Sequence, residues 1–208
     1  MDSGTGGPAR RRARRAAVLA MVLAAAAVAA AAWWNRAWLG GLFFRPEAPA
    51  AAELARVREE VQRRAADPQR LAQGVAALHE RLNQLAGWDR IRNLDWEAFR
   101  RDEPAYTRQL DELASQAGDP RLHADLQVAA ELLRRAAAGK DDRALLYAHR
   151  ILHDLDCRVF QVHCTETYWG YTVTLEGPGN PALRYLGEGH PVEQFLYQQG
   201  ILPNEPGS

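Results

Sequence analysis

Apolar residues recur at helical spacing through most of the chain beyond residue 50. Leu54, Val57 and Val61 form the first apolar stripe. Later stripes comprise Leu71, Val75, Leu78, Leu82 and Leu85; Tyr106, Leu110, Leu113 and Ala117; and Leu122, Leu126, Ala129, Leu133 and Ala136. Intervals of three and four residues place each set on one face of a helix. The pattern therefore predicts a series of amphipathic helices that share a core.

Short polar signals separate these stripes. Asp67-Pro68 and Asp119-Pro120 each place a capping carboxylate before a proline that suits the first helical position. Asp95 is a further candidate cap, and Pro104 is expected to begin another helical run. Because the connections are short, successive helices should be antiparallel neighbours, which predicts a helical bundle over residues 53–156.

Glycines and a second pair of aspartates refine the expected boundaries. Gly87, Gly118 and Gly139 stand near the ends of three predicted helices. Asp141 or Asp142 can cap the last helix of the bundle, which is expected to run to about Asp156.

The character of the sequence changes after residue 156. Apolar residues alternate at Phe160, Val162 and Cys164, and again at Tyr171, Val173 and Leu175. Alternation with β-branched and aromatic residues is typical of short strands. Residues 157–202 are therefore predicted to form a small mixed cap, with a β-hairpin as one option and a short helix over 190–200. Residues 203–208 are expected to form a loose tail.

The N-terminal segment is typical of a membrane anchor. Five arginines lie within residues 1–15, and the nineteen residues from Ala16 to Trp34 carry no charge. As a helix they would span about 28 Å, close to the hydrocarbon thickness of a bilayer. Tryptophans at 33, 34 and 38 would lie in an interfacial aromatic belt. We expect a transmembrane helix over residues 16–39, inserted in the lipid bilayer, and a linker over 40–52.

Charge distribution sets the expected orientation. The first 45 residues contain seven arginines and one acid, which favours a cytoplasmic N-terminus and a C-terminal domain outside the cell membrane. The alternative is a secretory signal that is cleaved near Ala32. The remaining chain has 19 basic and 25 acidic residues, which argues against a nucleic-acid partner. Only Lys140 among 26 basic residues is lysine, which indicates a GC-rich bacterial genome.

Candidate chemistry is concentrated in HRILHDLDCRVFQVHC, residues 149–164. On a helix, His149, His153 and Asp156 form a polar stripe beside the apolar face. One hypothesis is a metal site, for which zinc is the favoured ion because imidazole and thiolate are its usual ligands. The candidate ligands are His149, His153, Cys157, His163 and Cys164. The spacing lacks both the His-Glu-x-x-His motif and paired Cys-x-x-Cys knuckles.

Two other interpretations of this stretch remain open. Cys157 and Cys164 are the only cysteines and would form a disulfide if their compartment is oxidising. Alternatively, the histidines and Asp156 hydrogen-bond at the boundary between bundle and cap, with both thiols unbridged. The first two interpretations exclude each other, because a sulfur in a disulfide cannot ligate zinc as a thiolate.

Aromatic residues around Gly170 form a second candidate site. Tyr168, Trp169 and Tyr171 would line a groove for a sugar or a peptide, or would cover the end of the bundle. Asp156 is a further candidate binding residue. The chain carries no glycine-rich phosphate loop and no nucleophile elbow, so the sequence favours binding over catalysis.

These features predict a mainly α protein with one transmembrane helix, an antiparallel helical bundle and a small C-terminal cap. Its expected role is that of an envelope interaction or scaffold module with an unidentified protein partner. The alternative is a metal-binding protein or metal-dependent enzyme that uses His149 and His153 with Cys157 or Cys164.

Overall fold

A computed structural model describes residues 47–87, 90–163, 167–177 and 179–203, and these residues form helices and loops. The predicted transmembrane helix over 16–39 lies outside the described residues. Within them, no helix combines the length and the apolar character that crossing a bilayer requires.

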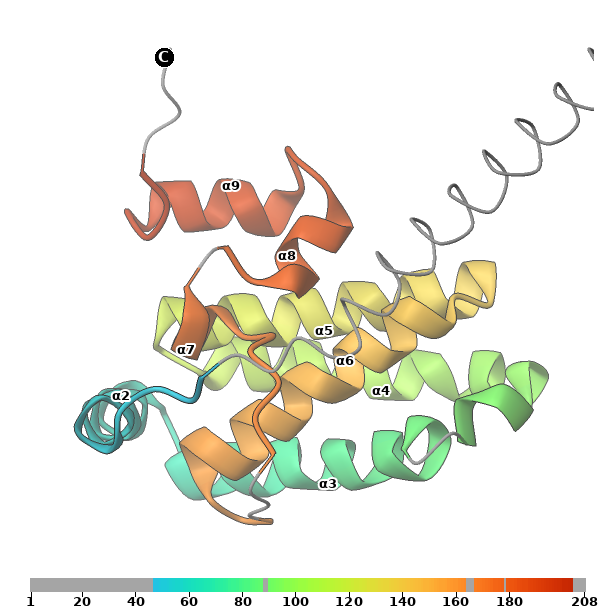
Figure 1. Ribbon diagram of the computed structural model, residues 1–208, viewed down its shortest axis with the longest axis horizontal. Coiled ribbons are helices and arrows are strands. Elements are labelled where there is room, and N and C mark those ends of the chain that lie inside the picture. The colour runs from blue at the N-terminus through green and yellow to red at the C-terminus, as the bar shows by residue number, and fades with distance from the viewer. Residues whose placement is uncertain (1–46, 88–89, 164–166, 178, 204–208) are drawn as a thin grey trace, which may run out of the picture. The chain divides into compact units, whose positions relative to one another are not determined.

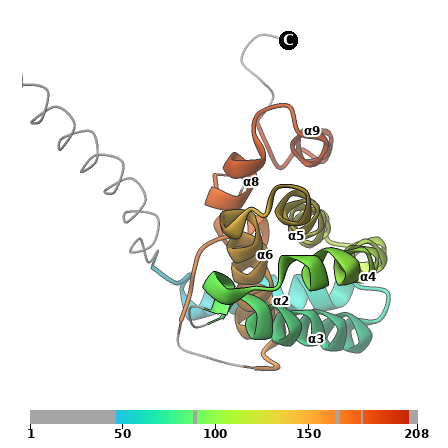
Figure 2. The same ribbon diagram turned by 90° about the vertical axis from the view of Figure 1, so that its right-hand side faces the viewer.

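Four long helices form the bundle (Figure 1). They are α3 (Pro68–Ala86), α4 (Trp96–Gln116), α5 (Pro120–Gly139) and α6 (Asp142–Asp154). Each packs against the next, and α6 also packs against α3, so the four close around a shared core, as the view along the bundle shows (Figure 2). The connections from α4 to α5 and from α5 to α6 are only a few residues long. The prediction of a helical bundle is confirmed.

Aspartate caps start all four of these helices. The side chains of Asp67, Asp95, Asp119 and Asp141 each accept at least one backbone N–H of the following turn. These contacts satisfy donors that have no partner inside a helix, which explains why the helices begin where the sequence indicates.

Two expected boundaries differ in the structure. Pro104 lies inside α4 and starts no new helix, because Phe99 before it and Leu110 after it are both buried on one continuous face. A single proline removes one hydrogen bond, and the packing on both sides offsets that loss. At the end of α5, Lys140 adopts the left-handed conformation with φ of 53°, and Gly139 remains helical.

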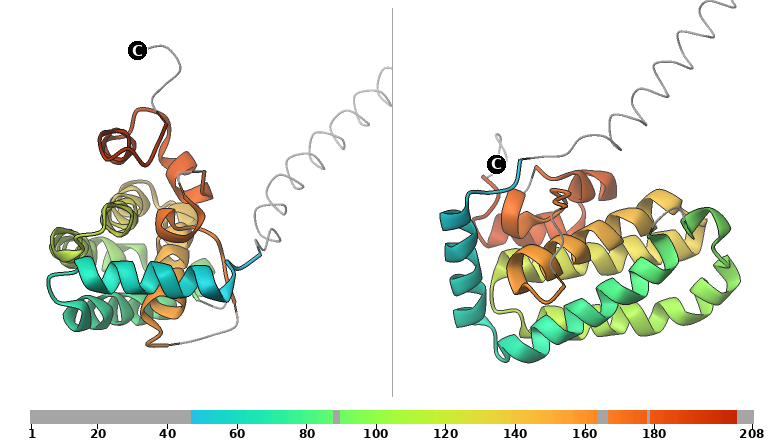
Figure 3. Two further views of the ribbon diagram at one scale, coloured as in Figure 1. Left: turned by 90° about the vertical axis from the view of Figure 1, so that its left-hand side faces the viewer. Right: turned by 60° about the horizontal axis from the view of Figure 1, so that its bottom comes forward.

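Helix α2 (Ala51–Arg64) crosses one end of the bundle (Figure 3). Its C-terminal end meets the turn between α4 and α5, where Gly118 has φ of +63°. A Cβ atom on Gly118 would lie 2.0 Å from the carbonyl oxygen of Arg64. Glycine is required here both by the backbone conformation and by the close approach of α2.

The C-terminal cap is helical, which corrects the prediction of two short strands. The π-helix η2 (Leu155–Phe160) continues α6, and α7 (Val173–Glu176), α8 (Pro181–Leu186) and α9 (Pro191–Gln198) follow. The described residues contain no strand. The alternating apolar residues of 171–175 instead enter a one-turn helix that packs on α5, while the expected C-terminal helix is present as α9.

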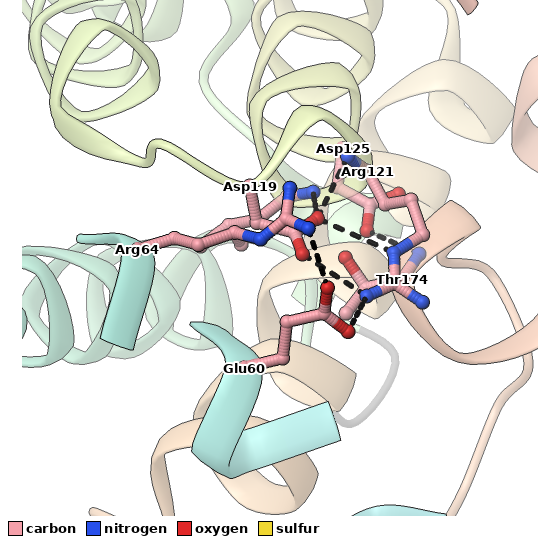
Figure 4. A network of polar contacts seen from close by, with 7 residues as sticks. Glu60, Arg64, Asp119, Arg121, Asp125 and Thr174 are labelled. Atoms are coloured by element: carbon pink, nitrogen blue, oxygen red, sulfur yellow. Dashed lines mark hydrogen bonds and ion pairs between the residues drawn. The ribbon is translucent and has the colours of Figure 1, made fainter. Parts of the chain in front are cut away.

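A polar network joins α2, α5 and α7 (Figure 4). Arg121 contacts Glu60 at 3.1 Å and Asp119 at 3.0 Å, and Glu60 also pairs with Arg64 at 2.7 Å. Burial alone would raise the pKa of Asp119, but the hydrogen bond and charge of Arg121 and two backbone N–H groups together lower it below its usual value. This network fixes the junction of three helices, so we assign it a structural role.

Candidate functional site

Four of the six histidines gather on one side of the bundle. His79 comes from α3, His149 and His153 come from α6, and His163 follows the π-helix η2. The first three are buried, whereas the His163 side chain is 58% exposed. The cluster therefore lies at the edge of the core, with one imidazole reaching solvent.

Asp156 is at the centre of this cluster and is fully buried. Its Oδ2 atom lies 2.7 Å from Nδ1 of His79 and 3.1 Å from Nδ1 of His163. The backbone N–H of His163 donates to Oδ1 at 3.2 Å. Burial would raise the pKa of Asp156, but hydrogen bonds from His79 and His163 bring it below its usual value. Asp156 is therefore a carboxylate at neutral pH and holds two imidazoles.

The π-helix explains how His163 reaches Asp156. After η2, Gln161 adopts a left-handed conformation with φ of 58°, and the N–H of Val162 donates to the carbonyl oxygen of Asp156 at 3.3 Å. The chain thus folds back on the last turn and brings His163 over the carboxylate. Single π-turns are rare and occur often at functional sites.

His79, Asp156 and His163 have the donor set of a metal site. Their ligand atoms all lie within 4.8 Å of one another. Zinc bound at about 2.0–2.1 Å in a tetrahedron places its ligands about 3.3 Å apart. The separations at Asp156 are 2.7 Å and 3.1 Å, so the ligand atoms would have to move apart slightly to admit the ion. Two imidazole nitrogens and a carboxylate oxygen are usual zinc ligands, and three protein ligands leave a fourth position for water or another ligand. The residues fit a zinc ion.

His149 and His153 pack around the His79 ring. His149 stacks on it with centroids 5.4 Å apart, and His153 meets it edge-on at 5.1 Å. Both contacts fix the orientation of the His79 imidazole, as neighbours of metal ligands commonly do. Among the described residues, neither histidine belongs to the group whose ligand atoms converge.

The two α6 histidines differ in charge. Burial, followed by the positive charges of the neighbouring His79, His153 and Arg150, lowers the pKa of His149 to about 3. Burial would also lower the pKa of His153, but Asp154 and Cys157 raise it to about 9. At neutral pH His149 is neutral and His153 is protonated, so a metal ion bound to His153 would have to displace a proton.

Cys157 is buried beside the same group. Its thiol contacts the carbonyl oxygen of His163 at 2.6 Å, and Sγ lies 3.8 Å from Nε2 of His153. Cys164 lies outside the described residues, so the predicted disulfide between Cys157 and Cys164 stays a prediction. The metal hypothesis for His149, His153 and Cys157 stays a prediction, while His163 and Asp156 join the group that the structure assembles.

His79 is a candidate ligand that the sequence pattern did not predict. It lies 77 positions before Asp156, so no local motif connects them. One signal was available: His79 lies four residues after Val75 and eight after Leu71, on the apolar face of its helix. A titratable residue on such a face needs a polar partner from elsewhere in the fold.

The aromatic candidates lie on the segment 167–172, next to the histidines. Asp154 accepts the N–H groups of Trp169 at 3.0 Å and Tyr171 at 3.2 Å. The Trp169 ring lies 6.3 Å from that of His153. The hydroxyl of Tyr168 donates to Glu176, and burial followed by this hydrogen bond raises the Tyr168 pKa. Tyr168 is thus engaged within the cap.

A separate hollow of about 350 Å³ lies between α3 and α4. Its walls include Arg70, Arg108 and Glu112 and contain no member of the histidine cluster. The hollow therefore does not serve as an entrance to the candidate metal centre.

Comparison of the chain with protein-family models, with curated proteins and with solved structures finds no match. The candidate function accordingly depends on the geometry of the site.

Proposed function

We propose that this protein is a metal-binding helical domain that holds a zinc ion at His79, Asp156 and His163. The main support is the shared carboxylate oxygen of Asp156, which lies 2.7 Å and 3.1 Å from two imidazole nitrogens. The ion would replace the protons between these groups and relieve their competition for one oxygen. Zinc would also connect α3 to the segment that leads into the C-terminal cap, and would therefore stabilise the fold.

We expect the full-length chain, stripped of metal on a chelating resin, to bind one equivalent of zinc. His163→Ala should weaken this affinity by about 10–100-fold or more, because a directly coordinating group is lost. Its side chain is mostly exposed, so little packing is lost with it. The affinity is measured by competition with a chromophoric chelator, and the melting temperature with and without zinc reports the stabilisation.

Two histidine variants serve as controls for this measurement. His190→Ala removes a histidine that caps α9 outside the cluster, and should leave zinc affinity unchanged. His149→Ala should reduce affinity far less than His163→Ala. If His149→Ala abolishes binding and His163→Ala does not, zinc is held by the α6 histidines and the proposed ligand set is wrong.

We also propose that residues 16–39 anchor this domain in the cell membrane and display it outside the cytoplasm, where it acts as an interaction module for an envelope protein. The support is the basic segment followed by a long uncharged run. A reporter fused to the C-terminus should be active in the periplasm, and the full-length chain should remain in the membrane fraction. Recovery of a soluble form that begins near residue 33 would instead indicate signal cleavage near Ala32.

A further inference from the structure

Arg150 is a buried cation without an acidic partner in the part of the chain that the structure describes. It lies on α6 and is 4% exposed. Its guanidinium carbon lies 4.5 Å from the centre of the Trp169 ring and 5.0 Å from that of Tyr171. None of the described carboxylates forms an ion pair with it. Among the described residues, the direct contacts of the guanidinium are thus two aromatic rings and one neutral hydroxyl, while the buried carboxylate of Asp154 lies one helical turn away without pairing with it.

The hydrogen bonds of Arg150 leave one buried edge of the guanidinium without a partner among the described residues. Nη1 donates to the hydroxyl of Tyr171 at 2.6 Å. Nε is buried and has no hydrogen-bond partner, and Nη2 has none among the described residues either. Nε and Nη2 together form the side of arginine that binds a carboxylate through two parallel hydrogen bonds.

We propose that the Nε–Nη2 edge of Arg150 binds the carboxylate group of a small organic anion, next to the rings of Trp169 and Tyr171. Such a ligand would satisfy a buried N–H donor and would neutralise a buried charge, both of which are costly to leave uncompensated. A single negative charge matches the single guanidinium. The two aromatic rings suit the apolar part of the ligand.

Trp169 gives this site a way to open and a spectroscopic signal. It is only partly buried and belongs to a segment without regular secondary structure, which Asp154 holds through two backbone N–H groups. The indole can therefore shift while the segment stays attached. A carboxylate beside Arg150 would change the cation–π contact and with it the emission of Trp169. None of the groups of this site is a proposed zinc ligand.

The test is a fluorescence titration of the metal-free, full-length chain with formate, acetate and benzoate. Chloride and phosphate at matched ionic strength are the comparison anions. We expect saturable quenching with the carboxylates and none with chloride. Arg150→Gln should weaken binding at least about tenfold, and Arg150→Lys should weaken it as well because an ammonium lacks the planar fork.

Three further measurements keep the result unambiguous. Trp169→Phe should remove the optical signal while calorimetry still detects acetate binding. His163→Ala should bind acetate like the unmodified chain, which separates this site from the zinc site. If Arg150→Gln fails to fold, Arg150→Lys and the rise of the melting temperature with acetate carry the test. Equal responses to acetate and chloride, or preference for phosphate, would overturn the proposal.

Discussion

Replacing Asp156 with alanine is expected to abolish zinc binding and to destabilise the folded domain. Asp156 is fully buried and is the shared acceptor of two imidazoles and one backbone N–H. Its removal deletes a ligand and leaves His79 with a buried donor that has lost its acceptor. Breaking a buried polar network of this kind costs about 3–5 kcal/mol. Urea denaturation without metal measures this loss, and chelator competition measures the affinity for zinc.

The variant Asp156→Asn separates ligation from packing. Asparagine keeps the shape and one carbonyl acceptor but lacks the negative charge, so it should recover part of the stability and little of the zinc affinity. Asp154→Asn is the matched control, since Asp154 is equally buried and accepts two backbone N–H groups outside the ligand group. It should lower stability and leave zinc affinity nearly unchanged. Binding by Asp156→Asn at the affinity of the unmodified chain would contradict the proposed site.

The bundle was predictable because its signals are local. Each cap needs an aspartate and the backbone of the next turn, and Asp67 and Asp119 also precede prolines that suit helix starts. The error at Pro104 has the opposite origin. A proline locally indicates a helix boundary, but residues of α4 on both sides of it are buried in the shared core, and this packing keeps the helix continuous.

The cap was less predictable because tertiary contacts decide its structure. Residues 171–175 alternate like a strand, yet Asp125 on α5 accepts the N–H groups of Val173 and Thr174. These are the donors that a helix start leaves unpaired, so a distant carboxylate stabilises a one-turn helix. For the same reason His79 was missed at the candidate site, whereas Asp156 and His163 could be found from their local spacing.

Asp125 leads to the second prediction, which concerns the dependence of stability on pH. Burial raises its pKa to about 7, and this outweighs the hydrogen bonds from Val173 and Thr174, which favour the charged form. The nearby charge of Asp119 contributes to this rise. The folded state therefore holds a proton on Asp125 that the unfolded chain releases at about pH 4.

The direction of the pH dependence follows from the difference in the Asp125 pKa between the folded and unfolded states. Between about pH 4 and pH 7 the folded state binds more protons than the unfolded state, so the free energy of unfolding should fall as pH rises and level off above pH 7. A shift of about three pKa units corresponds to roughly 4 kcal/mol, which is the upper limit of the effect. Asp125→Asn removes the charge and should remove this slope. Between pH 5 and pH 8 the stability of the variant should therefore rise relative to that of the unmodified chain.

Urea denaturation of both chains from pH 4.5 to pH 8.5 measures the difference between their free energies of unfolding. Because both chains contain the same histidines, the effect of histidine titration largely cancels in this difference. Asp141→Asn is the control, because Asp141 also caps a helix but its pKa is lowered. Burial opposes that shift, and the hydrogen bonds from Tyr185 and from the backbone of α6, together with the charge of Arg135, outweigh it. Asp141 is charged throughout this pH range, so its variant should differ from the unmodified chain by a constant amount. A stability difference between Asp125→Asn and the unmodified chain that does not change with pH would contradict this prediction. It would mean that Asp125 is ionised in the folded state, where the backbone N–H groups of α7 stabilise the charge more than burial destabilises it.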